Sequence, residues 1–301
     1  MTVLNFDGII PPIPTPFKDG RLACDHLAAN VERWCQSEIV GLLALGSNGE
    51  YVYLSPEEKL KLVATVASAA PGDRTILAGT GCESTGETIR LTRACADRGA
   101  HVALVVTPCY YGGQMVPDVL IRHYETLADQ SPIPILLYNV EKFTHVNLDP
   151  PIVARLSRHQ NIIGIKDSSG NVAQLGAYLN QVEAGFKVLV GTASALYPAL
   201  ALGCDGGILA LANVAPHACV AIHRLVRRGD HEAARQLQLT FLALNQAVTA
   251  RYGVPGLKAA LEMVGYYGGE PRPPLLPLAA ADCRILYRIM ADAGLELEVP
   301  A

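Results

Sequence analysis

The sequence lacks any apolar run of the roughly 18 residues that a membrane-spanning helix needs. Residues 1–7 contain neither a charged stretch followed by an apolar one nor an arginine-rich amphipathic stretch. Secretion signals and organelle-targeting segments carry those patterns. We therefore expect a soluble, cytoplasmic protein with no membrane partner.

Runs of basic residues are also absent. The chain has 24 Lys and Arg against 28 Asp and Glu, which gives a formal net charge of -4. Nucleic acid and anionic membrane surfaces are usually bound by clustered positive charge, which this balance does not provide. The composition excludes these partners and favours a small molecule as the ligand.

Metal-binding and disulfide patterns are missing as well. The eight cysteines include no C-x-x-C pair and lie mostly within apolar stretches, and the histidines show no H-E-x-x-H spacing. Cysteines in such surroundings are typically reduced and behave as small apolar residues. No cluster of carboxylates resembles a cation site. The sequence predicts free thiols, no metal and no other cofactor.

Short apolar runs, in contrast, recur at intervals along most of the chain. Each is rich in residues typical of buried strands, and most end near Gly, Thr, Ser, Asn or Pro. The eight runs cover residues 8–14, 40–46, 75–79, 102–107, 133–138, 162–166, 187–191 and 207–211. Their number and spacing indicate a repeated strand unit.

The segments between these runs carry helix signals. The clearest is Ser55, a helix-capping residue followed by Pro56 at the first helical position and by Glu58 three residues after the cap. Further helices are predicted over residues 85–96, 117–128, 171–182, 193–202 and 215–226. Eight buried strands alternating with helices predict a closed parallel (β/α)8 barrel, the TIM-barrel fold. An open doubly wound sheet would require a glycine-rich turn after the first strand, where this chain has the proline-rich residues 11–17.

The strand pattern stops near Gly229. Residues 230–301 show only helical periodicity, with helices expected over 231–246, 257–264 and 278–293 and breaks at 253–256 and 265–269. We therefore divide the chain into a catalytic barrel at 1–229 and a C-terminal helical extension at 230–301. Extensions of this kind usually pack against the barrel wall or a neighbouring subunit.

The run at 162–166 ends on Lys166, which is unusual for a buried strand. Burial disfavours the ammonium form of lysine, and a neutral amine is a nucleophile. The alternative is a structural lysine that pairs with the adjacent Asp167. The chain contains seven lysines, and Lys166 is the only one at the C-terminal end of a predicted strand.

Other polar residues follow the neighbouring strands. Gly46 and Gly49 flank Ser47 and Asn48, so backbone N–H groups there could bind an anion such as a carboxylate, although a simple hydrogen-bonded turn is an alternative. Tyr138 ends another strand and could relay protons or serve only as a buried structural tyrosine. Because the strand ends of a barrel meet at one mouth, these residues converge with the lysine. The combination indicates Schiff-base chemistry on a 2-oxo acid.

Five motifs carry a family resemblance: Gly-Ser-Asn-Gly-Glu, Val-Thr-Pro-Cys-Tyr-Tyr, Leu-Leu-Tyr-Asn-Val, Gly-Ile-Lys-Asp-Ser-Ser-Gly and Ala-Leu-Ala-Asn-Val. They resemble the pyruvate-dependent class I lyases, which include dihydrodipicolinate synthase, N-acetylneuraminate lyase and 4-hydroxy-2-oxoglutarate aldolase. The resemblance covers essentially the whole chain. Ser-Asn-Gly-Glu in place of the usual Thr-Thr-Gly-Glu of dihydrodipicolinate synthase, together with residues 79–85 and 265–269, is most similar to the 4-hydroxy-2-oxoglutarate aldolase branch.

The resemblance implies roles for the catalytic residues. Lys166 would form the Schiff base, and Tyr138 would shuttle protons at the attacked carbon. Ser47 would link Tyr138 to a tyrosine from a neighbouring subunit, with Tyr110 preferred and Tyr111 as the alternative. This shared site implies at least a dimer, and the homotetramer expected from the resemblance would be a dimer of such dimers.

The resemblance also implies a substrate pocket. Ser47 and Asn48 would hold the carboxylate of the 2-oxo acid, while Ser168, Gly191 and Ile208 would line the pocket. The ligands would be pyruvate and an aldehyde.

Residues 139–145 depart from the family pattern. Dihydrodipicolinate synthase carries an arginine in this segment for the carboxylate of its second substrate, and this chain has Asn-Val-Glu-Lys-Phe-Thr-His. Glu141 also replaces a proline that is usual across the family.

We therefore predict a lyase that cleaves 4-hydroxy-2-oxoglutarate to pyruvate and glyoxylate. The alternatives within the class are a 2-keto-3-deoxy sugar-acid aldolase, a dehydratase, and 4-hydroxy-tetrahydrodipicolinate synthase (dihydrodipicolinate synthase). A catalytically silent barrel is a further alternative, against which the intact set of Lys166, Tyr138 and Ser47 argues.

Overall fold

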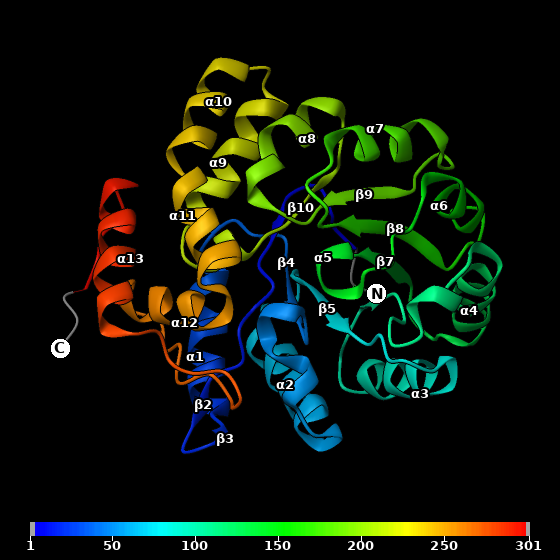
Figure 1. Cartoon of the computed structure of the whole chain (residues 1–301), viewed down its shortest axis with the longest axis horizontal. Helices are drawn as coiled ribbons and strands as arrows, with labels where there is room; N and C mark the ends of the chain where they lie inside the picture. The colour runs from blue at the N-terminus through cyan, green and yellow to red at the C-terminus, as the bar shows by residue number, and fades with distance from the viewer. Residues whose placement is uncertain (1–3, 299–301) are drawn as a thin grey trace.

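The computed structural model describes residues 4–298 and shows a ring of parallel strands surrounded by helices (Figure 1). Neighbouring strands pair in the order β1-β10-β9-β8-β7-β6-β5-β4. Val40 N–H donates to the Ile9 carbonyl and Leu43 N–H to the Pro11 carbonyl, each at 3.0 Å, so the first and last strands of this order are also joined. The predicted (β/α)8 barrel is confirmed. The barrel strands are β1 (Ile9–Ile10), β4 (Gly41–Ala44), β5 (Thr75–Gly79), β6 (Val102–Val106), β7 (Ile135–Asn139), β8 (Ile162–Asp167), β9 (Lys187–Val190) and β10 (Gly206–Ile208).

The six helices predicted around the ring are present, whereas the helices at residues 24–35, 141–144 and 150–156 had no predicted segment. The capping box at Ser55 and Glu58 is present at the start of its helix. The helix expected over 193–202 begins instead as the 3-10 turn η4 (Ala193–Ala195), and an antiparallel hairpin of β2 (Phe17–Lys18) and β3 (Arg21–Leu22) was not predicted. None of the helices within residues 4–298 is long and apolar enough to cross a membrane. They are α1 (Cys24–Cys35), α2 (Pro56–Ala69), α3 (Thr85–Ala96), α4 (Pro117–Gln130), α5 (Glu141–Thr144), α6 (Pro150–Leu156), α7 (Val172–Gln181), α8 (Leu196–Leu202) and α9 (Pro216–Arg227).

The strands separate two apolar clusters. Successive side chains of a strand point to opposite faces, so one set fills the barrel and the other packs under the helices. The inner cluster contains Tyr138 together with Ile10, Leu43, Leu77, Leu104, Leu136, Leu189 and Ile208. The outer cluster takes the alternate residues, among them Leu42, Ile76, Ala103, Leu137, Ile165 and Val188. This alternation along each strand decides which polar side chains at the strand ends can reach the barrel interior.

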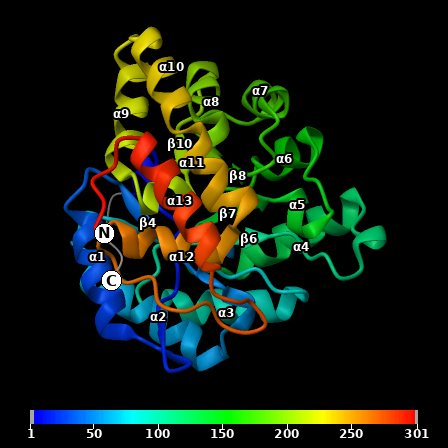
Figure 2. The ribbon, with the colours of Figure 1, turned by 60° about the vertical axis from the view of Figure 1, so that its left-hand side comes forward.

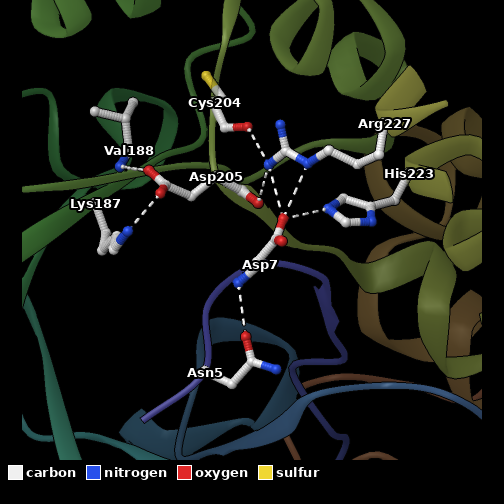
Figure 3. Close-up of polar contacts among 8 residues, drawn as sticks. All are labelled: Asn5, Asp7, Lys187, Val188, Cys204, Asp205, His223 and Arg227. Atoms are coloured by element: carbon white, nitrogen blue, oxygen red, sulfur yellow. Dashed lines mark hydrogen bonds and ion pairs between the residues drawn. The ribbon is translucent and has the colours of Figure 1, made fainter. Parts of the chain in front are cut away.

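Hydrogen bonds and ion pairs of charged side chains connect the amino ends of β1, β9 and β10 to one another and to α9 (Figure 3). Asp7 accepts hydrogen bonds from Arg227 and lies 3.0 Å from Nε2 of His223, which joins the segment before β1 to α9. Asp205 bonds Lys187 Nζ at 2.8 Å, and the Asp205 carbonyl accepts from Arg227 at 2.9 Å. These contacts close the ring at the end opposite the mouth, where a barrel's polar residues serve stability rather than chemistry.

The C-terminal helices gather on one side of the barrel, and α13 is the outermost (Figures 1 and 2). Two predicted boundaries were wrong. The helix expected over 231–246 is interrupted at Phe241, and the expected break at 253–256 is the first turn of α12. Pro255 is tolerated there because the first N–H groups of a helix have no partner within it. The elements are α10 (His231–Thr240), α11 (Leu242–Gln246), the π-helical turn η6 (Ala247–Arg251), α12 (Gly253–Met263) and α13 (Ala280–Asp292).

Candidate active site

Lys166 and Tyr138 lie side by side at the mouth of the barrel. They are register partners on β8 and β7, and residues paired across parallel strands point to the same face. Lys166 is only 3% exposed, and its Nζ lies 4.1 Å from the centroid of the Tyr138 ring. The structure therefore brings together the amine and the phenol that the sequence singled out.

Asp167 is not the partner of Lys166. Its side chain points to the outer face, where it is fully buried and accepts hydrogen bonds from Asn139 Nδ2 at 2.9 Å, Gln174 Nε2 at 2.8 Å and Tyr178 OH at 3.3 Å. The alternative of a structural Lys166 paired with Asp167 is therefore wrong, because adjacent residues of a strand point their side chains to opposite faces. Among the described residues no ion pair includes Lys166, so its amine remains available to a substrate.

Ser47 reaches the pair from the loop after β4. The 3-10 turn η1 (Ser47–Gly49) places Ser47 Oγ 3.5 Å from the Tyr138 hydroxyl, at the long limit for a hydrogen bond. The chain enters this turn through Leu45, which has φ of +58°, a left-handed conformation that is unfavourable for a bulky residue. Thr15 Oγ1 donates to the Gly49 carbonyl at 2.6 Å and holds the far end of the turn.

The surroundings of Tyr138 favour its ionised form. Burial alone would raise the pKa of this phenol. The positive charge of Lys166 and the neighbouring polar side chains of Ser47 and Ser168 outweigh burial and hold the pKa of Tyr138 below its usual value. Tyr138 is therefore suited to exchange a proton with a bound substrate.

The residues expected to line the pocket occupy neighbouring strand ends. Ser168 Oγ donates to the Gly191 carbonyl at 3.4 Å, and any Cβ at Gly191 would overlap the Ser168 hydroxyl. Ile208 is fully buried in the inner cluster, and Asn48 is half-buried in the same turn as Ser47. Their contact with a substrate stays a prediction.

Tyr110 and Tyr111 project from the loop after β6. They are 77% and 66% exposed, and their rings meet edge to face with centroids 5.0 Å apart. Glu83, for which the sequence predicted no role, accepts hydrogen bonds from the backbone N–H of Cys109 at 3.0 Å and of Tyr110 at 2.9 Å. The loop is thus fixed while its aromatic side chains stay free of the protomer's own core.

Tyr51 was also missed by the sequence analysis. It lines a small cavity beside Ser47 and Tyr138, together with the glycines at 46, 79 and 81. Burial raises the pKa of Tyr51 to about 12, so this phenol stays protonated at neutral pH. In the sequence, only the closeness of Tyr51 to the Ser47–Gly49 turn could have indicated a place in the site.

Comparison with known proteins agrees with this geometry. The profile of the Dihydrodipicolinate synthetase family matches residues 5–292. This chain belongs to that family. It is accordingly an enzyme, a carbon–carbon lyase of the class I aldolase type that uses a lysine Schiff base. The predicted family resemblance is confirmed, while the finer resemblance to the 4-hydroxy-2-oxoglutarate aldolase branch stays a prediction.

Relatives and solved structures cover nearly the full chain. The 4-hydroxy-tetrahydrodipicolinate synthase of Methanoculleus marisnigri is 36% identical over 96% of this chain and 100% of its own length. The protein of the same name from Methanothrix thermoacetophila is 39% identical, over 91% and 92%. The chloride-inhibited dihydrodipicolinate synthase of Acinetobacter baumannii, complexed with pyruvate, is 32% identical with a TM-score of 0.91, over 96% and 99%. YagE, an E. coli K12 prophage protein of this family in complex with pyruvate, is 31% identical with a TM-score of 0.91, over 96% and 99%.

Proposed function

We propose that this enzyme cleaves a 4-hydroxy-2-oxo acid, with 4-hydroxy-2-oxoglutarate as its substrate, to pyruvate and glyoxylate. The observation that carries the proposal is the buried amine of Lys166, which lies against Tyr138 at the barrel mouth and has no carboxylate partner among the described residues. Such an amine is placed to form a Schiff base with a 2-oxo acid. Pyruvate bound to two structural neighbours supports the same ligand class.

The bond changes follow from this pair. The Tyr138 phenolate takes a proton from the Lys166 ammonium, and the neutral Nζ attacks C2 of the substrate. The Tyr138 phenol then protonates the departing hydroxyl, so that loss of water leaves a protonated imine and restores the phenolate. The Tyr138 phenolate takes the proton from the C4 hydroxyl, the C3–C4 bond breaks, and its electrons flow into the imine to give an enamine and glyoxylate. A proton returned to C3 and hydrolysis of the imine then release pyruvate. The imine itself is the electron acceptor, so the reaction requires no cofactor.

The remaining site residues would hold the substrate. Ser47 and Asn48, in the first two positions of the turn η1, would bind the carboxylate next to C2 through their side chains and backbone N–H groups. Ser168, Gly191 and Ile208 would line the apolar side of the pocket, toward the inner cluster.

A second candidate is 4-hydroxy-tetrahydrodipicolinate synthase, which the names of the curated relatives favour. That reaction condenses pyruvate with aspartate semialdehyde, whose carboxylate lies three bonds from the aldehyde carbon. In glyoxylate the carboxylate is attached directly to that carbon and would lie deep in the site. The segment after β7, in which Glu141, Lys142 and Phe143 are exposed, contains no arginine to hold a distant carboxylate. This difference favours the aldolase.

Substrate choice is therefore a direct test. We expect pyruvate release from 4-hydroxy-2-oxoglutarate, and weak or absent condensation of pyruvate with aspartate semialdehyde. A missing charge-assisted hydrogen bond costs about 1.5–3 kcal/mol, or roughly 10- to 150-fold in kcat/KM. Adding 2-keto-3-deoxy sugar acids to the panel, with assays for both pyruvate release and dehydration, tests the sugar-acid aldolase and the dehydratase. Efficient condensation with aspartate semialdehyde would overturn the aldolase assignment and would mean that another residue, with Lys142 as the first candidate, takes the arginine's role.

We also propose that the active unit is at least a dimer and that the enzyme is a homotetramer. The Tyr110–Tyr111 pair is a large exposed aromatic projection on a fixed loop, of the kind that a partner subunit usually covers. If two subunits exchange Tyr110, the contact is symmetric and a tetramer is a pair of such dimers. Tyr110 would then complete the proton relay through Ser47 to Tyr138.

Replacing Tyr110 tests this relay. We expect Tyr110→Phe to lower kcat by about 10- to 1000-fold, as loss of a proton-transfer group does, with no change of size in gel filtration. Tyr111→Phe is the matched control and should stay close to the parent. Mixing Tyr110→Phe with Lys166→Ala subunits should restore part of the activity, because some sites then combine an intact lysine with an intact tyrosine. A fully active monomer, or a Tyr110→Phe variant as fast as the parent, would contradict the shared site.

A further inference from the structure

A buried carboxylate connects the Ser47–Asn48 turn to the C-terminal extension. Glu50 follows η1 directly and is 2% exposed. Its Oε1 lies 2.6 Å from Lys258 Nζ on α12, and its Oε2 accepts a hydrogen bond of 2.7 Å from the backbone N–H of Arg272, between α12 and α13. Both oxygens are thus held by residues more than 200 positions away in the sequence.

Lys258 is a second deeply buried lysine, although the sequence placed it on a helix face. It is 1% exposed, donates to the Glu270 carbonyl at 2.9 Å and lies 4.5 Å from the Phe17 ring centroid. Burial lowers the pKa of Lys258, and the Glu50 carboxylate opposes that effect. An apolar pair of similar volume is often as stable as a buried ion pair. Stability alone therefore does not account for the Glu50–Lys258 pair, and fixing a local conformation is the role that we consider here.

The Arg272 side chain forms hydrogen bonds with the segment that follows Glu50. Its guanidinium makes two bonds to the Glu58 carboxylate, at 2.6 and 2.7 Å, and another to the Tyr53 carbonyl at 2.8 Å. It also lies 4.1 Å from the centroid of Phe17. The extension consequently holds residues 50–58 at several points.

The turn that these contacts hold is strained at both ends. Leu45 before it has φ of +58° and Glu50 after it has φ of +53°, and neither is glycine. Left-handed residues of this kind persist only where surrounding contacts impose them, and they concentrate at functional sites. The Glu50 contacts with Lys258 and Arg272 are such constraints.

We propose that Lys258 is a positioning residue for catalysis: its ion pair with Glu50 fixes the Ser47–Asn48 turn in the geometry that binds the carboxylate of the 2-oxo acid. The inference rests on the proposed function and assigns the C-terminal extension a part in substrate binding. Lys258 acts through Glu50 and does not itself touch the substrate.

The test compares Lys258→Met with the double variant Glu50→Gln, Lys258→Met. The single change leaves a buried carboxylate without its cation, whereas the double change removes both charges. We expect Lys258→Met to raise the KM for the 4-hydroxy-2-oxo acid, and the pyruvate concentration that gives half-maximal borohydride trapping, by about tenfold, and to lower kcat by less than about threefold. The double variant should recover to within about threefold of the parent. Lys61→Met, an exposed lysine on α2, is the matched control.

Hydrogen exchange provides a second readout that does not depend on activity. Amides of residues 45–54 should exchange faster in Lys258→Met than in the parent and should be slowed again in the double variant. If the parent is not trapped by pyruvate, the proposed function fails and this exchange comparison still decides the inference. The positioning role of Lys258 would be overturned if Lys258→Met lowered only Tm. In that case KM, pyruvate trapping and amide exchange at residues 45–54 would all match the parent. Should Lys258→Met fail to fold, Glu50→Gln alone replaces it, with the same direction of change expected.

Discussion

Lys166→Ala is expected to lower the rate of pyruvate release by about 10⁵-fold or more, the scale on which loss of a covalent nucleophile acts. Without the amine no imine can form, so nothing accepts the electrons of the breaking C3–C4 bond. The measurement is steady-state pyruvate release from 4-hydroxy-2-oxoglutarate. Lys187→Ala is the matched control, because Lys187 lies at the amino end of β9 and pairs with Asp205 away from the mouth. Its kcat should stay within about twofold of the parent.

Two results would contradict this role. One is a Lys166→Ala variant that keeps more than a small fraction of the parent rate. The other is activity that a chelator removes, which would indicate metal-assisted chemistry in place of a Schiff base.

Tyr138→Phe is expected to lower kcat by about 10²- to 10⁴-fold, with a smaller change in KM, because it removes the proposed proton carrier and leaves the ring that packs against Lys166. Burial would raise the pKa of Tyr138, but the Lys166 charge and the neighbouring Ser47 and Ser168 side chains lower it. In the parent, kcat should therefore rise with pH as this phenol ionises, below the usual tyrosine range, and Tyr138→Phe should abolish that rise. The measurement is kcat against pH for both enzymes.

Tyr124→Phe is the control for this change. Tyr124 is fully buried under the barrel wall, and its hydroxyl donates to the Val105 carbonyl at 3.2 Å. Its loss should lower Tm and leave the pH profile in place. A Tyr138→Phe enzyme with the parent's kcat and pH profile would show that another group moves the proton.

The barrel and its central pair were predictable because both follow from local patterns. Buried strand runs alternating with capped helices specify the fold, and strand ends in a barrel meet at one mouth, which brings Lys166 to Tyr138. The alternation of side chains along a strand also separates Lys166 from Asp167, and this alternation is a property of the sequence positions alone.

The contacts made by the extension could not be predicted in the same way. Lys258 looks like an ordinary helix lysine until α12 packs on the loop after β4, and its partner Glu50 lies more than 200 residues earlier. The predicted break at 253–256 was wrong because glycine and proline also fit the first turn of a helix. The proposed choice of second substrate rests on the segment after β7, where Lys142 and Phe143 are exposed and packing does not fix their side chains.

The most direct test of the central claim is borohydride reduction of the enzyme in the presence of pyruvate, followed by peptide mass spectrometry. We expect irreversible inactivation and one stable pyruvyl adduct per chain on the peptide that contains Lys166, with neither in Lys166→Ala. Modification of Lys258 or any other lysine, or no adduct in an active enzyme, would contradict it.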